Sequence, residues 1–199
     1  MRHNPFNAVK QPRSLMSLVR RYGRDENGTT AVEFGLIALP FTAVLVGMMM
    51  VCVYYFKQLE VENAVYQSAR DLRVGNLQQG LGAYNGLSGD ALKDAFKQAM
   101  CNRMSNPGDC FTNMRVLVQS RTDFASVTEP NCKDGGGNLI SNTTANGSFN
   151  AGGASSVVVV TGCYQWDFGG PMPFLNIGTM PGGKYLIQAT YAARTEPYN

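Results

Sequence analysis

Residues 28–56 read GTTAVEFGLIALPFTAVLVGMMMVCVYYF, and this stretch decides the architecture of the chain. No charged residue occurs between Phe34 and Phe56. These twenty-three residues would form a helix of about 35 Å, which is enough to cross a hydrocarbon core of about 30 Å. The stretch therefore predicts one transmembrane helix, with a single acid, Glu33, just inside its start.

Charge is distributed unevenly around this span. The 199-residue chain has a net charge of +3. Residues 1–28 contain six Lys or Arg residues and two acidic residues, which gives a net charge of +4. Residues 29–199 contain eleven Lys or Arg residues and twelve acidic residues, which gives a net charge of −1. Because positive residues beside a span stay in the cytoplasm, this split predicts a cytoplasmic N-terminus and an exported C-terminal part. The same uneven distribution argues against nucleic acid binding as the explanation for the net positive charge of the chain.

Both ends of the span carry local signals. Thr30 and Glu33 have the spacing of a capping box, so we expect the helix to begin with Thr30 as its N-cap. Residues 54–56 are aromatic and form a belt of the kind found at membrane interfaces, and Lys57 can extend to the headgroups. Pro40 lies inside the run, where membrane helices tolerate it.

The helical pattern continues beyond the span. Small and apolar residues recur at helical spacing: Val61, Ala64, Val65, Ser68 and Leu72. Gly75 suits the position that follows a helix C-terminus. We therefore expect one helix over residues 29–75, transmembrane to about residue 56 and followed by a soluble domain over residues 76–199.

The rest of the chain predicts a small α+β domain. We expect a second helix over residues 88–104 and a turn at residues 106–108. Three segments have strand patterns: 114–120, 157–166 and 185–193. They predict an antiparallel sheet of three or more strands, packed on the two helices. Residues 123–156 are long for a structureless loop, which indicates a functional or mobile segment.

Four cysteines, Cys101, Cys110, Cys132 and Cys163, lie in the part expected to be exported. An even set in a small exported domain predicts two disulfides. Three pairings are open, and we favour the sequence-local one, Cys101–Cys110 with Cys132–Cys163. Their spacing contains no CxxC, which argues against zinc. We interpret Cys52, within the span, as a small buried apolar residue.

The sequence contains little that indicates a catalytic site. His3 is the single histidine and lies before the span, so the exported part has no histidine for a nucleophilic triad or a metal site. We expect no enzyme activity, no metal and no cofactor. Trp166, with Tyr164 and Phe168, is interpreted as core packing against the second helix, with a contact patch as the alternative.

The start of the span resembles the processing site of type IV-like prepilins. The matching residues are Gly28-Thr-Thr-Ala-Val-Glu33-Phe34. The resemblance implies that a prepilin peptidase cuts after Gly28, so that the mature chain begins at Thr29. It also implies that Glu33 meets the new amino terminus of a neighbouring subunit and so sets the register between subunits. Such an ion pair is far stronger in lipid than in water.

A longer stretch resembles TadE-like pseudopilins of tight-adherence (Flp) pilus systems. The similarity is carried by TAVEFGL at residues 30–36, by Pro40, by LEVENAVYQSAR at residues 59–70 and by RTEPY at residues 194–198. It implies a minor pilin or pseudopilin that inserts once in the inner membrane, with residues 1–28 as a cytoplasmic leader and the C-terminal domain in the periplasm. Its implied partners are the prepilin peptidase, other pilins and the pilus assembly platform.

Two other classes of function remain open from the sequence. The first is an uncleaved, membrane-anchored periplasmic binding or assembly factor, with residues 123–156 as its binding surface. The second is an anchored hydrolase, which the absence of an exported histidine disfavours.

Overall fold

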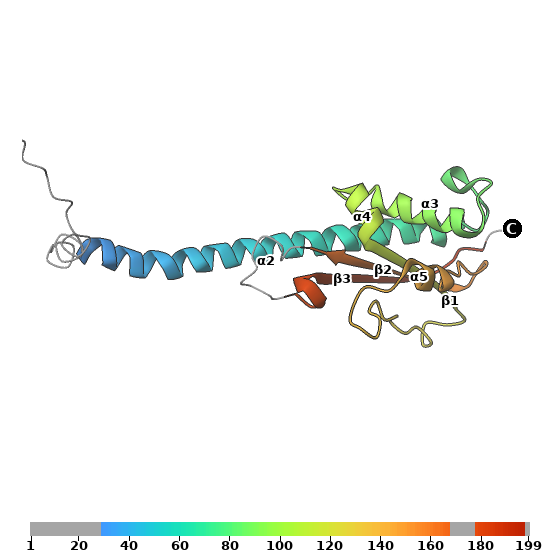
Figure 1. The fold of residues 1–199 in the computed structure, drawn as a ribbon. Helices are drawn as coiled ribbons and strands as arrows, with labels where there is room; N and C mark the ends of the chain where they lie inside the picture. Colours follow the sequence, from blue (N-terminus) through green and yellow to red (C-terminus); the bar gives the residue numbers. More distant parts are fainter. Residues whose placement is uncertain (1–28, 168–177, 198–199) are drawn as a thin grey trace, which may run out of the picture. The chain divides into compact units, whose positions relative to one another are not determined.

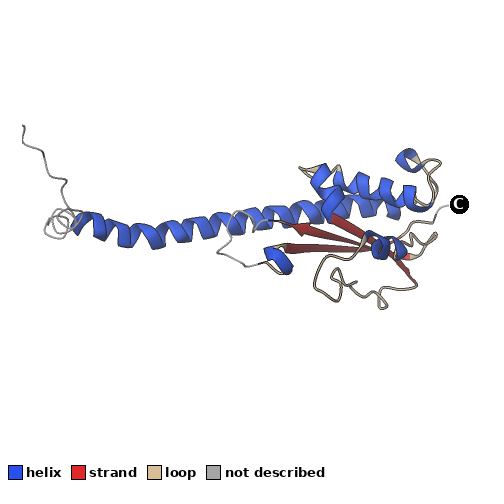
Figure 2. Ribbon diagram, viewed as in Figure 1, coloured by secondary structure: helices blue, strands red, loops and turns tan. Residues whose placement is uncertain are grey.

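The computed structural model describes residues 29–167 and 178–197. The elements follow the chain in this order: α2 (Thr29–Arg73), η2 (Gly82–Tyr84), α3 (Gly89–Cys101), α4 (Pro107–Asn113), β1 (Met114–Arg121), α5 (Asn142–Gly147), β2 (Val157–Trp166), η3 (Pro181–Gly183) and β3 (Tyr185–Arg194). The predicted fold class is confirmed, because a long N-terminal helix precedes a small domain of helices and a three-stranded antiparallel sheet (Figure 2). The chain divides between Cys52 and Val53 into two compact units.

α2 begins at Thr29 and passes without a break through Pro40. The predicted N-cap at Thr30 is therefore wrong, because Thr30 already lies within the helix. The proline removes one backbone N–H from the helical ladder. Two residues further on, the hydroxyl of Thr42 donates to the carbonyl of Ala38 at 2.8 Å, so this polar side chain is satisfied by its own helix. Membrane helices accommodate polar groups in this way.

The C-terminus of α2 is closed by the glycine that the sequence indicates. Gly75 has a φ of 81°, which glycine adopts without steric cost. Its amide donates to the carbonyl of Leu72 at 3.2 Å, and the amide of Asn76 donates to the carbonyl of Asp71 at 3.0 Å. This pair of hydrogen bonds is a Schellman motif, and it ends the helix at Arg73.

The three strands form one antiparallel sheet with β2 in the centre. Val160 of β2 lies opposite Val118 of β1 and Tyr191 of β3. All three predicted strands are confirmed, and each outer strand extends one residue further than predicted. β2 is buried over most of its length, as expected for a continuous β-branched segment with both faces covered.

The second half of α2 lies between α3 and the sheet (Figure 1), and buried residues of all three form one core. The five residues of the predicted stripe are all buried: Val61, Ala64, Val65, Ser68 and Leu72. Phe96 and Met100 of α3 contact the same core and are fully buried. The helical period of the sequence therefore identifies the packed side of α2.

The helix predicted over residues 88–104 ends earlier, at Cys101. A second short helix, α4, begins at Pro107, where the sequence predicted only a turn. Asn106 is its N-cap, because its side-chain oxygen accepts a hydrogen bond from the amide of Asp109 at 3.3 Å. Proline suits the first helical position, where no N–H is required.

The segment between β1 and β2 is more structured than a loop. It contains α5, and Lys133 and Leu139 form an isolated antiparallel bridge. A second apolar cluster joins this segment to the sheet: Leu117, Cys132, Ile140, Ala145 and Cys163. Since side chains alternate along a strand, this cluster lies on the sheet face opposite α2.

Candidate functional site at the start of the apolar helix

The first turns of α2 carry the residues of the predicted processing site. Gly28 lies outside the described residues. Thr29 is the first residue of the helix, and Glu33 and Phe34 are both exposed, Phe34 to 73%. Residues four apart share one face of a helix, so Thr29 and Glu33 lie on the same face. Phe34 lies about 100° around the helix axis from Glu33.

The electrostatics of this end favour a negative group. Glu33 is the one charged residue between Thr29 and Phe56. The first turn of a helix carries the positive end of its dipole, which favours a nearby carboxylate. An uncompensated carboxylate at mid-bilayer costs about 2.5–3.5 kcal/mol and less near an end of the span. Glu33 can therefore accept hydrogen bonds from a cation in a place where other polar partners are scarce.

The helix beyond Glu33 presents an apolar surface. Its most apolar window has a mean hydropathy of 2.5, and none of that window is buried inside the described protein. In the described chain, α2 is the one helix long and apolar enough to span a membrane. Cys52 belongs to this surface and carries an exposed free thiol, so the prediction that it is buried within the protein is wrong.

The other four cysteines form two disulfides. Cys101 is bonded to Cys110 and Cys132 to Cys163, with Cα–Cα distances of 5.4 and 5.7 Å. These are the sequence-local pairs. The first joins α3 to α4, and the second joins the segment after β1 to the central strand.

An open groove of about 690 Å³ lies beside the end of α2. Charged side chains line much of it: Arg70, Asp71, Arg73, Arg103 and Glu196. Several of these charges pair with one another. Arg103 Nη2 lies 3.3 Å from Asp71 Oδ2, and Arg73 Nε lies 3.5 Å from Glu196 Oε1. The amide of Glu196 also donates to the carbonyl of Arg73 at 2.8 Å. This hydrogen bond and the ion pair between the same two residues hold the segment after β3 against the end of α2.

Two buried tyrosines donate to carboxylates in the C-terminal unit. The hydroxyl of Tyr84 donates to Asp71 Oδ2 at 3.3 Å, and that of Tyr164 donates to Asp109. Burial, together with the adjacent carboxylate, raises the pKa of each tyrosine well above its usual range. Both therefore remain neutral donors that hold packed elements together.

Trp166, at the end of β2, is half-buried at the edge of the core, and its ring centroid lies 6.4 Å from that of Tyr185. Phe168, which the sequence grouped with it, lies outside the described residues. Among residues 29–167 and 178–197, no group of three or more His, Cys, Asp or Glu residues could hold a metal ion.

Comparison with known proteins finds one family match, and it lies in the first part of the chain. The family model described as TadE-like protein matches residues 28–70. No curated protein and no solved structure matches the chain. The matched residues include Thr29, Glu33 and the packed stripe of α2 from Val61 to Ser68, and the family is structural rather than enzymatic. Residues 28–70 thus carry a TadE-like sequence, as the motif predicted.

Proposed function

We propose that this chain is a minor pilin or pseudopilin of a tight-adherence pilus. It inserts in the inner membrane through α2, is cut after Gly28 by a prepilin peptidase, and joins other pilins through the same helix. The observation that carries the proposal is a TadE-like helix whose apolar surface is exposed and interrupted near its start by one acid. Such a surface requires lipid or the helices of other subunits.

Glu33 has a specific role in this proposal. Cutting after Gly28 places an ammonium group on Thr29, at the positive end of the helix dipole, where a cation is unfavourable. The carboxylate of Glu33 in a neighbouring subunit compensates that charge. Because both groups lie in an apolar layer, one axial offset between subunits pairs them and other offsets leave charges unpaired. The pair therefore sets the register of assembly.

The proposal assigns the three parts of the chain to three locations. Residues 1–28 are a basic cytoplasmic leader, residues 29–75 are the helix, and residues 76–199 form the periplasmic domain that contacts other pilins and the assembly platform. The charge difference across the span supports this orientation. The two disulfides also support it, since disulfides persist in oxidising compartments.

Mass spectrometry of the protein from cells that assemble the pilus tests the processing step. We expect a mature chain that begins at Thr29. Gly28→Val should leave the leader attached, because valine adds a branched side chain where glycine lets the peptidase approach the backbone closely. Asn27→Ala is the matched control and should be processed normally. A chain that retains residues 1–28 in piliated cells contradicts processing and supports the uncleaved periplasmic binding factor.

A second experiment tests the register role. Glu33→Gln removes the charge but keeps the size, and we expect normal membrane insertion with loss of incorporation into the pilus. Glu62→Gln is the control, because Glu62 is an exposed acid of the same helix outside the apolar run. Normal piliation with Glu33→Gln contradicts the register role.

A further inference from the structure

Two tyrosines of α2 each contact a tyrosine of β3. The ring centroids of Tyr54 and Tyr185 are 5.7 Å apart, and those of Tyr66 and Tyr191 are 5.1 Å apart. The first pair lies beside the end of the charge-free run, which closes at Phe56. The second pair lies about 18 Å further along the helix axis, at 1.5 Å per residue. The two pairs are chemically alike but differ in their distance from the span.

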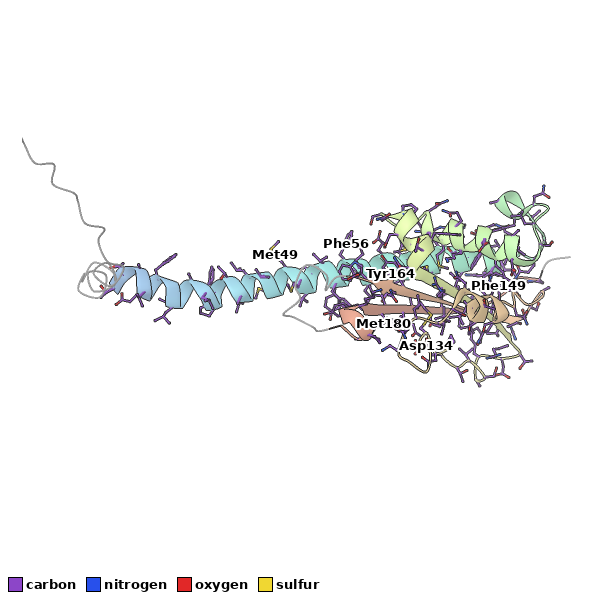
Figure 3. All side chains as sticks on the ribbon, in the orientation of Figure 1. Met49, Phe56, Asp134, Phe149, Tyr164 and Met180 are labelled. Atoms are coloured by element: carbon purple, nitrogen blue, oxygen red, sulfur yellow. A yellow bond between two sulfur atoms is a disulfide. The ribbon has the colours of Figure 1, made fainter. Side chains whose placement is uncertain are left out.

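A third ring extends the first pair. Trp166 is the last residue of β2 and Tyr185 the first residue of β3, and they lie opposite each other in the sheet. Tyr54, Trp166 and Tyr185 therefore form a cluster from three elements, which we call the aromatic edge. Figure 3 labels Phe56 of α2 and Tyr164 of β2, which lie two positions from Tyr54 and from Trp166 in the sequence.

The position of Tyr54 on α2 determines the depth of the aromatic edge. Tyr54 precedes Phe56 by two residues, or about 3 Å along the helix. When residues 34–56 fill the hydrocarbon core, Tyr54 lies at its boundary, next to an interfacial layer about 5–8 Å thick on each side. Tyr185 contacts Tyr54 and is held near the same depth. Lys184 adjoins the cluster in sequence and brings a cation that can reach lipid phosphates.

The chemistry of these side chains suits that layer. Tyrosine and tryptophan combine an apolar ring with a polar O–H or N–H, and both are enriched at membrane interfaces. We infer that the aromatic edge docks the C-terminal unit on the membrane, with Trp166 and Tyr185 in the headgroup layer of the phospholipids. This inference rests on the proposed insertion of α2 and adds a second contact with the membrane, made by the sheet.

The single tryptophan of the chain gives a direct test. The full-length protein is reconstituted in phosphatidylcholine vesicles whose acyl chains are brominated either near the headgroup or near the methyl end. We expect bromine near the headgroup to quench the emission of Trp166 more strongly than bromine near the methyl end. Flotation of the same vesicles on a density gradient measures insertion of α2 independently.

The two tyrosine pairs supply a variant and a matched control. Tyr54→Ala should reduce the quenching, because it removes the ring that joins Tyr185 to α2. Tyr66→Ala removes the equivalent ring of the distant pair and should leave the quenching unchanged. Circular dichroism of both variants confirms that the fold is retained.

The outcomes separate docking from insertion. Protein that floats with the vesicles but shows equal Trp166 emission with and without bromine overturns the docking and leaves the proposed insertion intact. Stronger quenching by bromine near the methyl end overturns the interfacial depth. Full quenching in Tyr54→Ala overturns the role of α2 in setting that depth. Protein that does not float overturns insertion and docking together.

Discussion

The side chain of Val65 occupies the space in which a side chain on Gly162 would lie. A Cβ atom on Gly162 would come 2.6 Å from Cγ2 of Val65, which is well inside van der Waals contact. α2 and the central strand can therefore approach closely at this point because residue 162 is glycine. The contact lies wholly within the C-terminal unit and sets the distance between helix and sheet.

We expect Gly162→Ala to destabilise the C-terminal unit by about 1–3 kcal/mol, because the new methyl group overpacks the core. Thermal unfolding of the detergent-solubilised chain, followed by Trp166 fluorescence, measures the change. The double variant Gly162→Ala/Val65→Ala should be less destabilised than the sum of the single variants, since the smaller side chain makes room. Gly108→Ala is the control, because a Cβ there meets no atom within 4 Å. Additive effects in the double variant contradict the contact.

Lys97 of α3 is a buried lysine, 8% exposed, whose Nζ lies 4.5 Å from the ring centroid of Phe111. Burial and then the positive charge of Arg115 lower its pKa from 10.5 to about 8. Between these two pH values the unfolded chain holds the proton and the folded chain releases it, so the free energy of unfolding rises with pH. Below about pH 8, Lys97 is charged in both the folded and the unfolded chain, so folding carries the full cost of burying its ammonium group.

Lys97→Met should remove this cost. We expect the variant to be more stable than the wild type at pH 7 by about 1–3 kcal/mol, with the interaction between the ammonium and the Phe111 ring reducing the gain. The advantage should shrink as the pH rises from 8 towards 10.5. Thermal unfolding of both proteins across this range measures the difference, and a difference independent of pH contradicts the lowered pKa.

The sequence predicts those elements whose local pattern coincides with their packing. The stripe from Val61 to Leu72 lies on the buried side of α2, and β2 is β-branched because both of its faces are covered. α4 was not predictable in this way. Its first residues, Pro107 and Gly108, favour a turn locally, and the helix depends on the Asn106 cap and on the disulfide to α3.

In the candidate site, too, the sequence predicts the local pattern but not the features that depend on three-dimensional structure. The motif places Thr29 and Glu33 at the start of the helix, but the helix begins one residue before the predicted cap, since cap positions depend on backbone geometry. Cys52 was assigned to the interior because an apolar pattern does not separate side chains that face lipid from those that face a core. Trp166 and Tyr185 are far from Tyr54 in sequence, and the sheet register brings them together.

Glu60 fixes the turn between α3 and α4 on α2. Its carboxylate accepts hydrogen bonds from the amide of Ser105 and from Lys57 Nζ, the latter at 2.8 Å. Burial alone would raise the pKa of Glu60, but the hydrogen bonds from Lys57 and Ser105 outweigh burial and the pKa is lowered from 4.5. The stabilisation is therefore present above pH 4.5 and is lost as the pH falls through the lowered value.

We expect Glu60→Gln to destabilise the protein by about 1–2 kcal/mol near neutral pH, with a smaller effect at a pH below the lowered pKa, where the wild-type carboxyl is also neutral. Thermal unfolding at both pH values tests this. Glu62→Gln is the control, because its exposed carboxylate accepts a hydrogen bond only within its own helix, from Gln58 at 2.9 Å. An equal loss of stability at both pH values shows that the charge of Glu60 is not the cause.

The disulfide between Cys132 and Cys163 holds the segment between β1 and β2 on the sheet face opposite α2. In the chain-entropy model, closing this loop stabilises the fold by about 3.5 kcal/mol, and the shorter loop of the Cys101–Cys110 disulfide contributes about 3 kcal/mol. The two disulfides therefore differ little in global stabilisation, but they should differ in which segment each one protects.

Replacing Cys132 and Cys163 by serine should open the part of the segment around Lys133 before the rest of the domain unfolds, because only noncovalent contacts, such as the hydrogen bond from Arg115 Nε to the carbonyl of Ile140 at 3.1 Å, then hold the segment on the sheet. Trypsin should then cut first after Lys133, the one tryptic site between Arg121 and Val157. The matched variant with Cys101 and Cys110 replaced should lose similar stability without early cleavage at Lys133. Limited proteolysis with mass spectrometry distinguishes these results, and identical first cleavage sites in both variants would show that packing alone holds the segment.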